Sequence, residues 1–470
     1  MGGTWSPTSP PADPGFYVNF EALATATVTG GQSGVVLLPL HDAVWGPVGE
    51  TVELYSLAEY DRLYTNTDCD ARKAVAGAFT GTGYAPGAQR VLVHRLGADV
   101  DGGDTSTKAA VTVSGLDFEA KHGGTGGDNL NVAIDVLNNV ANVVVERDGT
   151  KVWEMEFDVD PNDAVSVSAF AASLAAAQNN WFTVDANSTF DGSSGSSDFA
   201  GGVDATDDGK SYFTESELLN NDYNVVSTSD SVFGDELASA AVDYNLEGKR
   251  FLVVIGGPAG ETIDAACGAA KAIDNENVVR VGYTSLETEN GTISTAEFAP
   301  QLAGIIAANG PFRSITATHI SGMRVATKAS KADLRKARNN GLVMLVEDQI
   351  AARLYQDMTT YSSDTIHKPR KEFGVIKAVM VHHQIETDLT RAAEGGWIGG
   401  ANVNTANYRR AVLDGITGYL ARVEGAAMIL PGWEVDLDDL YDNTGDSIHI
   451  KYGIKTSRVV ERILNTIVLY

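Results

Sequence analysis

The chain has 470 residues, of which 43% are hydrophobic and 20% charged, a composition typical of a folded protein with several domains. Its formal net charge of −28 argues against nucleic acid as a partner, because phosphate binding needs a basic surface. The same charge predicts repulsion between copies, which any self-assembly has to overcome locally, although adaptation to high salt would give the same composition.

Two further classes of protein are disfavoured by the sequence. No stretch reaches the roughly 18 consecutive apolar residues that a membrane helix requires. The first twenty residues contain no Lys or Arg and no apolar core, so we expect no secretory signal. Direct insertion into a membrane is therefore not expected.

The N-terminal segment is predicted to be an extended arm that ends in a strand. Residues 1–14 contain four of the thirteen prolines, and residues 15–20 are rich in aromatic side chains in the alternating pattern of a strand. This strand has no obvious local partner, so we expect it to pair with a distant segment or with another chain. Buried strands are predicted at residues 34–40 and 91–96, with a helical stretch at 56–79 between them.

Residues 108–203 differ in character from their surroundings. They hold alternating segments typical of strands, and Asp148-Gly149 lies between two of them, 143–147 and 151–157, as a strong hairpin signal. A run rich in serine and glycine, residues 191–202, closes the block. We predict a separate β-rich domain inserted into a larger α/β domain.

From residue 251 onward, strands and helices are predicted to alternate. The sequence Ser294-Thr295-Ala296-Glu297 forms a capping box that opens one of the helices. Such alternation indicates a mainly parallel sheet covered by helices. The expected strands are residues 251–255, 278–281, 315–319 and 342–346, and the expected helices are 261–274, a helix from 294 to about Gly310, and 328–338.

The last third begins with a predicted strand at residues 375–381. A long amphipathic helix follows, capped by Thr405, with apolar residues at intervals of three and four. Residues 448–452 alternate as in a strand, and residues 460–470 again have the pattern of a strand. The chain thus ends, as it begins, with a predicted strand.

Together these segments predict a multidomain protein of the α/β and α+β classes. It has a central mixed α/β domain, an inserted β-rich domain, and a C-terminal α+β domain with extended terminal strand arms. The predicted boundaries are 1–23 for the N-terminal arm, 24–107 plus 204–345 for the central domain, 108–203 for the inserted domain, and 346–470 for the C-terminal domain.

Two glycine-rich segments have some features of ligand-binding loops. Gly256–Thr262 follows a buried strand and precedes a helix, as a phosphate loop does, but it lacks the lysine of that motif, and Glu261 adds negative charge. A tight turn is the favoured interpretation, and a nucleotide-dependent enzyme that uses this turn is the alternative. Gly123–Asn129 precedes a strand rather than a helix, so no helix dipole would hold an anion, and a flexible loop is predicted.

Residues that could bind metals give no site of recognised spacing. Asp158–Asp163 begins like a calcium loop but lacks the required glycine and the final bidentate glutamate. Cys69 and Cys267 are far apart in sequence and are predicted to be buried free thiols. His382 and His383 are neighbours at the end of a predicted strand, where they would point to opposite faces. We predict no catalytic residue, no cofactor and no metal.

A basic helix stands out from the acidic remainder of the chain. It could simply be a solvated surface. The functional alternative is an electrostatic contact with an acidic surface, either on a neighbouring copy or on an enclosed partner. Its basic residues are Lys328, Lys331, Arg335, Lys336 and Arg338.

Four segments follow one another in a characteristic order: Pro14–Phe20 (PGFYVNF), residues 33–48 with GVVLLPL and WGP, residues 121–131 (KHGGTGGDNLN) and residues 199–204 (FAGGVD). Their order resembles that in the tail sheath proteins of contractile bacteriophages and related injection machines. The C-terminal third is also similar, with a long helix followed by a closing strand that ends in Ile467-Val468-Leu469. Residues 250–345 depart most from the family's pattern.

This resemblance implies a structural subunit that polymerises around an inner tail tube and contracts to drive the tube through the envelope of a target cell. It implies as partners other copies of the chain, the tail tube protein, and baseplate and tail terminator proteins, with location in a virion tail assembled in the host cytoplasm. The C-terminal domain would face the tube and the inserted domain would lie outside. The residues implied to exchange strands between subunits are Gly15, Phe16, Tyr17, Val18, Asn19 and Phe20, and Ile467, Val468, Leu469 and Tyr470.

Two other classes of protein stay open at this point. One is the nucleotide-binding enzyme on a doubly wound fold. The other is a different protein of a virion surface, such as a capsid or adhesion component, which shares the acidic and glycine-rich composition.

Overall fold

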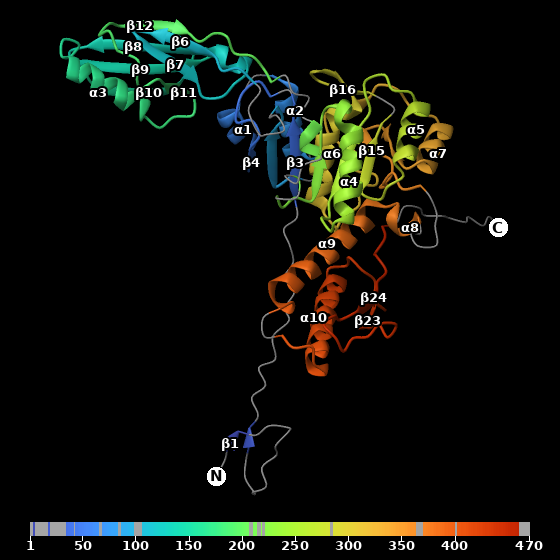
Figure 1. The fold of residues 1–470 in the computed structure, drawn as a ribbon. Helices are drawn as coiled ribbons and strands as arrows, with labels where there is room; N and C mark the ends of the chain where they lie inside the picture. The colour runs from blue at the N-terminus through green and yellow to red at the C-terminus, as the bar shows by residue number, and fades with distance from the viewer. Residues whose placement is uncertain are drawn as a thin grey trace. The chain divides into compact units, whose positions relative to one another are not determined.

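A computed structural model describes residues 3–4, 17–18, 34–41, 43–64, 68–82, 86–97, 106–205, 210–213, 218, 221–282, 285–362, 370–399 and 402–459. The chain divides into two compact units, residues 32–380 and residues 1–31 with 381–470, and each is described by itself (Figure 1). No helix within the described ranges is long and apolar enough to cross a membrane.

The larger unit is built on a seven-stranded sheet with the order β20-β15-β14-β13-β3-β5-β4. Neighbouring strands run parallel, except that β4 is antiparallel to β5. The mainly parallel sheet that alternation of strands and helices predicted is therefore present. Its strands are β3 (Val35–Leu40), β4 (Thr51–Leu54), β5 (Arg90–Arg95), β13 (Val225–Ser227), β14 (Leu252–Gly256), β15 (Val278–Val281) and β20 (Leu342–Val343).

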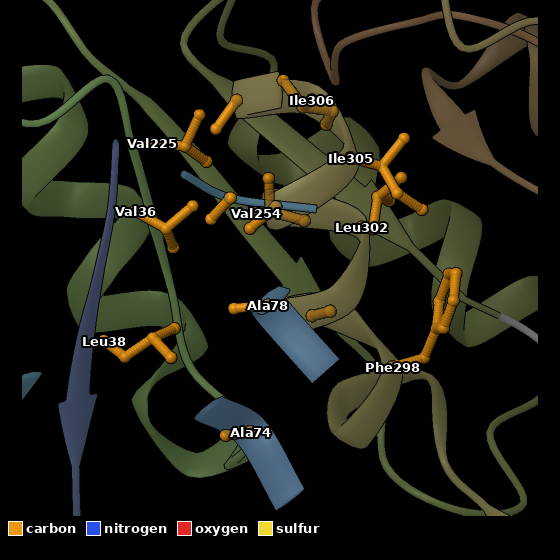
Figure 2. Close-up of a cluster of buried hydrophobic side chains, with 14 of the residues drawn as sticks. Val36, Leu38, Ala74, Ala78, Val225, Val254, Phe298, Leu302, Ile305 and Ile306 are labelled. Atoms are coloured by element: carbon orange, nitrogen blue, oxygen red, sulfur yellow. The ribbon is translucent and has the colours of Figure 1, made fainter. Parts of the chain in front are cut away.

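Helices cover both faces of this sheet. Alternate residues of β3 point in opposite directions, so Val36 and Leu38 pack in the core with α2 (Asp70–Thr80) and α6 (Thr295–Asn309) (Figure 2). Val35 and Leu37 belong to a second core, which they share with residues of α4 (Gly234–Leu246). This layered arrangement explains why the strand sequences are almost continuously apolar.

The ends of α6 are set by local sequence signals, and one predicted helical stretch is divided. The predicted capping box is present, because the Ser294 side chain accepts from the backbone of Glu297 and the Glu297 side chain accepts from the backbone of Ser294. Gly310 follows the last residue of α6. The helical stretch predicted at 56–79 is two helices, α1 (Leu57–Leu63) and α2, rather than one.

Residues 106–205 form two antiparallel sheets around their own apolar core, with strand orders β10-β9-β8-β12 and β11-β7-β6. The predicted hairpin turn at Asp148-Gly149 joins β9 to β10, and both residues have positive φ, 50° and 73°. The segments through which the chain enters and leaves this region lie side by side, because Thr107 and Val203 form an antiparallel β-bridge. The elements are β6 (Ala110–Val113), β7 (Leu116–Ala120), β8 (Leu130–Leu137), β9 (Val140–Arg147), β10 (Thr150–Asp158), α3 (Ala164–Ala175), β11 (Phe182–Val184) and β12 (Gly195–Asp198).

Smaller elements complete the larger unit. Helices α5 (Ile263–Ile273) and α7 (Lys331–Asn339) share a small apolar core with β20. Two three-stranded sheets, β17-β16-β19 and β18-β22-β21, lie outside the main sheet. Their strands are β16 (Leu286–Thr288), β17 (Gly291–Ile293), β18 (His319–Ile320), β19 (Arg324–Val325), β21 (Leu345–Glu347) and β22 (Ala352–Leu354), and a short helix, α8 (Arg370–Phe373), comes before α9.

The described part of the second unit contains the short strand pair β1 (Gly3–Thr4) with β2 (Tyr17–Val18) and a helical region with one hairpin. That region comprises the later part of α9 (Ile376–Ala392), the helical turn η5 (Ala393–Trp397), α10 (Ala406–Gly425), β23 (Glu434–Leu437) and β24 (Ile450–Gly453). Thr405 caps α10 as predicted, through its side chain and the backbone of Tyr408. The core of this unit includes Val381, Ile416 and Leu420.

Three predictions of secondary structure are wrong. The strand predicted at 375–381 is instead the start of α9, which begins at Ile376, because a short apolar run fits a buried helix as well as a buried strand. The strand predicted at 315–319 is mostly a turn, in which Ala317 has φ 61°, and β18 begins only at His319. The strand predicted at 342–346 is divided, since β20 and β21 belong to different sheets.

The broader prediction of a mixed α/β fold with several sheets is confirmed. The four domain boundaries that the sequence suggested stay a prediction.

Candidate assembly surfaces

The predicted N-terminal exchange strand is described only at Tyr17 and Val18. These two residues form β2 (Tyr17–Val18), which pairs in parallel with β1 (Gly3–Thr4). Strand exchange between subunits is therefore neither supported nor opposed by this pair, and it stays a prediction. The remaining exchange residues lie outside the described part of the chain: Gly15, Phe16, Asn19, Phe20, Ile467, Val468, Leu469 and Tyr470.

The hairpin β23–β24 is a two-stranded sheet of the second unit. Its strands pair over four residues, from Glu434 opposite Gly453 to Leu437 opposite Ile450. Among the described residues, neither strand is part of a wider sheet. Val435 and Tyr452 pack against the core of α9 and α10. A two-stranded sheet is marginal by itself, and its outer edges carry backbone groups that can accept a further strand.

The basic helix predicted at 328–338 is α7, which begins at Lys331 after the N-cap Ser330. Its inner face packs through Leu334 and Ala337 in the core shared with α5. Lys336 forms an ion pair with Asp264 of α5, which raises the pKa of Lys336. The outer stripe consists of the other four basic residues, all exposed: Lys328, Lys331, Arg335 and Arg338.

The loop considered as a nucleotide site is closed by the chain's own side chains. The carboxylate of Glu261 lies 2.6 Å from the guanidinium of Arg280 on β15, and both side chains are 8% exposed. The Gly257 N–H donates to the hydroxyl of Thr295 at 2.9 Å. Doubly wound folds bind ligands at this end of the sheet, beyond the carboxyl ends of the strands. Here a buried ion pair takes that position, as expected for a tight turn.

The second glycine-rich segment is packed, so the prediction of a flexible loop is wrong. It includes a 3₁₀ turn over Thr125–Asn129. Gly124 has φ 119°, and a Cβ atom there would lie 2.4 Å from the Val44 carbonyl oxygen. At Gly126 the corresponding distance would be 2.7 Å, and the Gly126 N–H donates to that same carbonyl at 3.0 Å. These glycines allow the inserted sheets to approach the segment after β3 closely.

A buried basic cluster holds the same junction. The guanidinium of Arg147 lies 5.5 Å from the ring centres of both Trp45 and Trp181, and its Nη1 donates to the Tyr64 carbonyl at 2.9 Å. Burial lowers the pKa of Arg147. Arg95 of β5 donates to the Gly46 carbonyl at 2.7 Å and, on the inserted side, to that of Gly123. We call Trp45, Arg95, Arg147 and Trp181 the junction cluster.

The junction cluster was not found from the sequence. Trp45 and Arg147 are separated by 102 positions, and nothing in the local sequence of either indicates the other. The resemblance of residues 121–131 to a family segment was the one available signal, and it marked the location without giving the partners.

Residues that could bind metals do not form a site in the described part of the chain, where no three His, Cys, Asp or Glu side chains converge suitably. Asp163, in the segment that begins like a calcium loop, instead caps α3. His382 and His383 lie on helix α9, so the strand geometry assumed for them is wrong. Cys267 is a buried free thiol as predicted, whereas Cys69 is only half-buried.

Comparison with known proteins now places this geometry in context. A sequence profile of the phage tail sheath protein central domain matches residues 217–360. This match includes all of residues 250–345, the region that we expected to depart most from the family's pattern. No curated protein matches the chain in a sequence search.

Solved structures resemble the chain over nearly its whole length. The sheath tail protein from Desulfitobacterium hafniense has a TM-score of 0.70 at 19% identity, covering 94% of this chain and 100% of that one. The sheath tail protein from Listeria innocua gives 0.65 at 16%, with 93% and 98% covered. The sheath of an extracellular contractile injection system, PVC, in its contracted state gives 0.58 at 11%, with 98% of each chain covered.

The chain therefore shares its fold with solved tail sheath proteins. More particularly, residues 217–360 carry the sequence signature of the tail sheath central domain, and the predicted relationship to tail sheath proteins is confirmed.

Proposed function

We propose that this chain is a tail sheath subunit that polymerises around an inner tail tube and contracts to drive the tube through the envelope of a target cell. The observation that carries the proposal is the agreement of a central-domain sequence match with a fold shared over 94% of the chain. Similarity to the PVC sheath in its contracted state supports the contractile role.

Assembly is proposed to work through added strands. Gly15–Phe20 and Ile467–Tyr470 of neighbouring copies would pair with the open edges of the β23–β24 hairpin. The hairpin supports this proposal because a sheet of two strands gains stability when further strands join it. Backbone hydrogen bonds of this kind tolerate rigid-body motion of the domains, which contraction requires.

The proposed arrangement follows the predicted domains. Residues 24–107 with 204–345 form the central domain, residues 108–203 lie outside, and residues 346–470 face the tube. The proposed partners are other copies of the chain, a tail tube protein, and baseplate and tail terminator proteins. The proposed location is the tail of a particle.

A catalytic role is not proposed, since sheath proteins are structural. The nucleotide-binding alternative would need an anion site after β14, and the Glu261–Arg280 ion pair opposes it by placing a carboxylate there. Titration calorimetry with ATP, GTP and NAD checks this point. We expect no heat of binding, and a saturable signal would favour the enzyme.

Truncation tests the strand linkage. A chain lacking residues 1–20 should remain folded by circular dichroism, because the apolar cores of the described residues are formed from residue 35 onward, but it should form no long tubes in negative-stain images. A chain lacking only residues 1–14 is the matched control, since it keeps Gly15–Phe20 and should assemble.

The outcomes of this test separate the candidate functions. Normal tubes from the chain without residues 1–20 would contradict strand exchange by the N-terminal arm. Closed shells or spikes formed by the full chain would indicate the other virion surface protein instead.

A further inference from the structure

We propose that the outer stripe of α7 docks on the acidic loop, residues 438–446, of a second copy of the chain. The inference rests on the proposed function, because the copies must meet in an assembly. It assigns to the basic helix a specific partner surface within the chain's own sequence.

The positive side of this contact is unusually concentrated. Residues 328–338 contain five basic residues, and no other stretch of that length in the chain contains five. On α7 itself, Lys331, Arg335 and Arg338 follow one another at intervals of four and three, so they lie along one face of the helix. The opposite face is occupied by packing against α5. The stripe therefore projects from a firmly held helix.

The negative side is concentrated in the segment that joins β23 to β24. Residues 434–446 contain six acidic residues and no basic one. Asp436 lies opposite Lys451 in the hairpin, so its charge has a neighbour of opposite sign. The acidic loop beyond it carries Leu440 and Tyr441, which are 84% and 57% exposed. Its four carboxylates belong to Asp438, Asp439, Asp442 and Asp446.

Hydrogen bonds hold the acidic loop in one conformation. The Asn404 side chain donates to the Asn443 carbonyl at 2.9 Å, and Arg409 donates to the same carbonyl at 3.0 Å. The Thr444 N–H and hydroxyl donate to Asp442, which lowers the pKa of that carboxyl and keeps it charged. A preformed, charged loop loses little conformational entropy when it binds.

The two surfaces match in chemistry as well as in sign. Guanidinium and ammonium groups of the stripe would pair with the loop carboxylates, while Leu440 and Tyr441 would cover their alkyl stems. A nine-residue helix and a nine-residue loop bury less than the roughly 1,000 Å² of a stable interface. Each contact would thus be weak by itself, but many copies of it along an assembly would together stabilise that assembly. It would also offset the repulsion expected between copies that each carry a net charge of −28.

Charge reversal tests the pairing. The helix variant is Lys331→Glu with Arg335→Glu, and the loop variant is Asp439→Lys with Asp446→Lys. The control is Glu156→Lys with Asp158→Lys, two exposed residues of β10. The control makes the same change of net charge as the loop variant. All are checked for folding by circular dichroism, and the critical concentration for tubes is measured by sedimentation at low and high salt.

Each reversal should raise the critical concentration at low salt by at least about tenfold, because like charges would then face one another. The control and the loop variant both make the chain less acidic, so general repulsion alone predicts easier assembly for both. A loss in the loop variant that the control does not show therefore identifies a specific contact. A chain with all four substitutions should return to near the wild-type value.

Mixing the helix variant with the loop variant shows whether the contact joins two copies. We expect the mixture to form tubes, since each altered surface finds its complement on the other protein. Rescue in the four-substitution chain without rescue in the mixture would place the contact within one chain and overturn the proposal. Unchanged critical concentrations in both variants would overturn it as well, while leaving the sheath function intact. Failure of the wild type to form tubes would contradict the sheath function itself, and this inference with it.

Discussion

The junction cluster and the outer stripe of α7 use the same kind of side chain in opposite ways. In the junction, Arg95 and Arg147 are 1% and 5% exposed, and they bind carbonyl groups and aromatic rings of their own chain. On α7, Lys331 and Arg335 are exposed. In a chain with a net charge of −28, the buried cations hold parts of one copy together, and the exposed cations are available to another copy. The following predictions test this contrast between buried and exposed charge.

The largest effect is expected at the buried ion pair. Glu261→Gln leaves Arg280 charged and without its carboxylate, so the free energy of unfolding should fall by about 3–5 kcal/mol. Asp264→Asn is the matched control, because its ion pair with Lys336 is exposed and screened by water. Urea denaturation measures both. Equal losses in the two variants would contradict the distinction between buried and exposed pairs.

A buried histidine of the main sheet gives a pH dependence. His94 is stacked on Tyr212 at 4.0 Å, and burial lowers its pKa from 6.5 to about 4. The unfolded chain therefore takes up a proton at this residue first, and stability falls as the pH drops from about 6.5 towards 4, by about 3 kcal/mol.

The measurement is the free energy of unfolding at several pH values in wild type and in His94→Gln. The variant cannot take up this proton, so its stability should depend less steeply on pH between 6.5 and 4. Carboxylates that titrate in the same range are present in both proteins and do not affect the comparison. Parallel curves would show that His94 is not the group responsible.

The smallest effect is expected at the glycines of the junction. Gly126→Ala would place a methyl group 2.7 Å from the Val44 carbonyl oxygen, and the required shift should cost about 1–3 kcal/mol. Gly268→Ala lies in helix α5 with open space around its Cβ, so it should stabilise by up to about 1 kcal/mol. Thermal denaturation followed by tryptophan fluorescence measures both. An unchanged stability of Gly126→Ala would show that the inserted sheets can move away from Val44 without loss of free energy.

Features set by neighbouring residues were predictable from the sequence. The capping box of Ser294, the Asp148-Gly149 turn and the basic face of α7 depend on residues within a few positions of one another, and all three are present. The prediction of a strand at 375–381 is wrong because the composition of a short apolar run does not determine whether it forms a strand or a helix. Met344 separates β20 from β21, and no local signal marks this change of sheet.

Features that depend on distant residues were not predictable. The junction cluster joins β5, β9 and the segment after β3, which meet only when the inserted sheets are folded. The β23–β24 hairpin has open edges because no other described strand pairs with it, and the local sequence does not indicate which strands will pair. The acidic loop has four Asp residues within nine positions, but we did not identify it from the sequence, because its relevance depends on its exposure and on the opposite charge of α7.

The most direct test of the central claim is cryo-electron microscopy of the purified full-length protein under assembly conditions. The account predicts hollow helical tubes in which each β23–β24 hairpin is extended by strands from neighbouring copies, including residues 15–20 and 467–470. Tubes whose hairpins have no added strands would contradict the linkage. A protein that stays monomeric over a wide range of concentration and salt would contradict the sheath function.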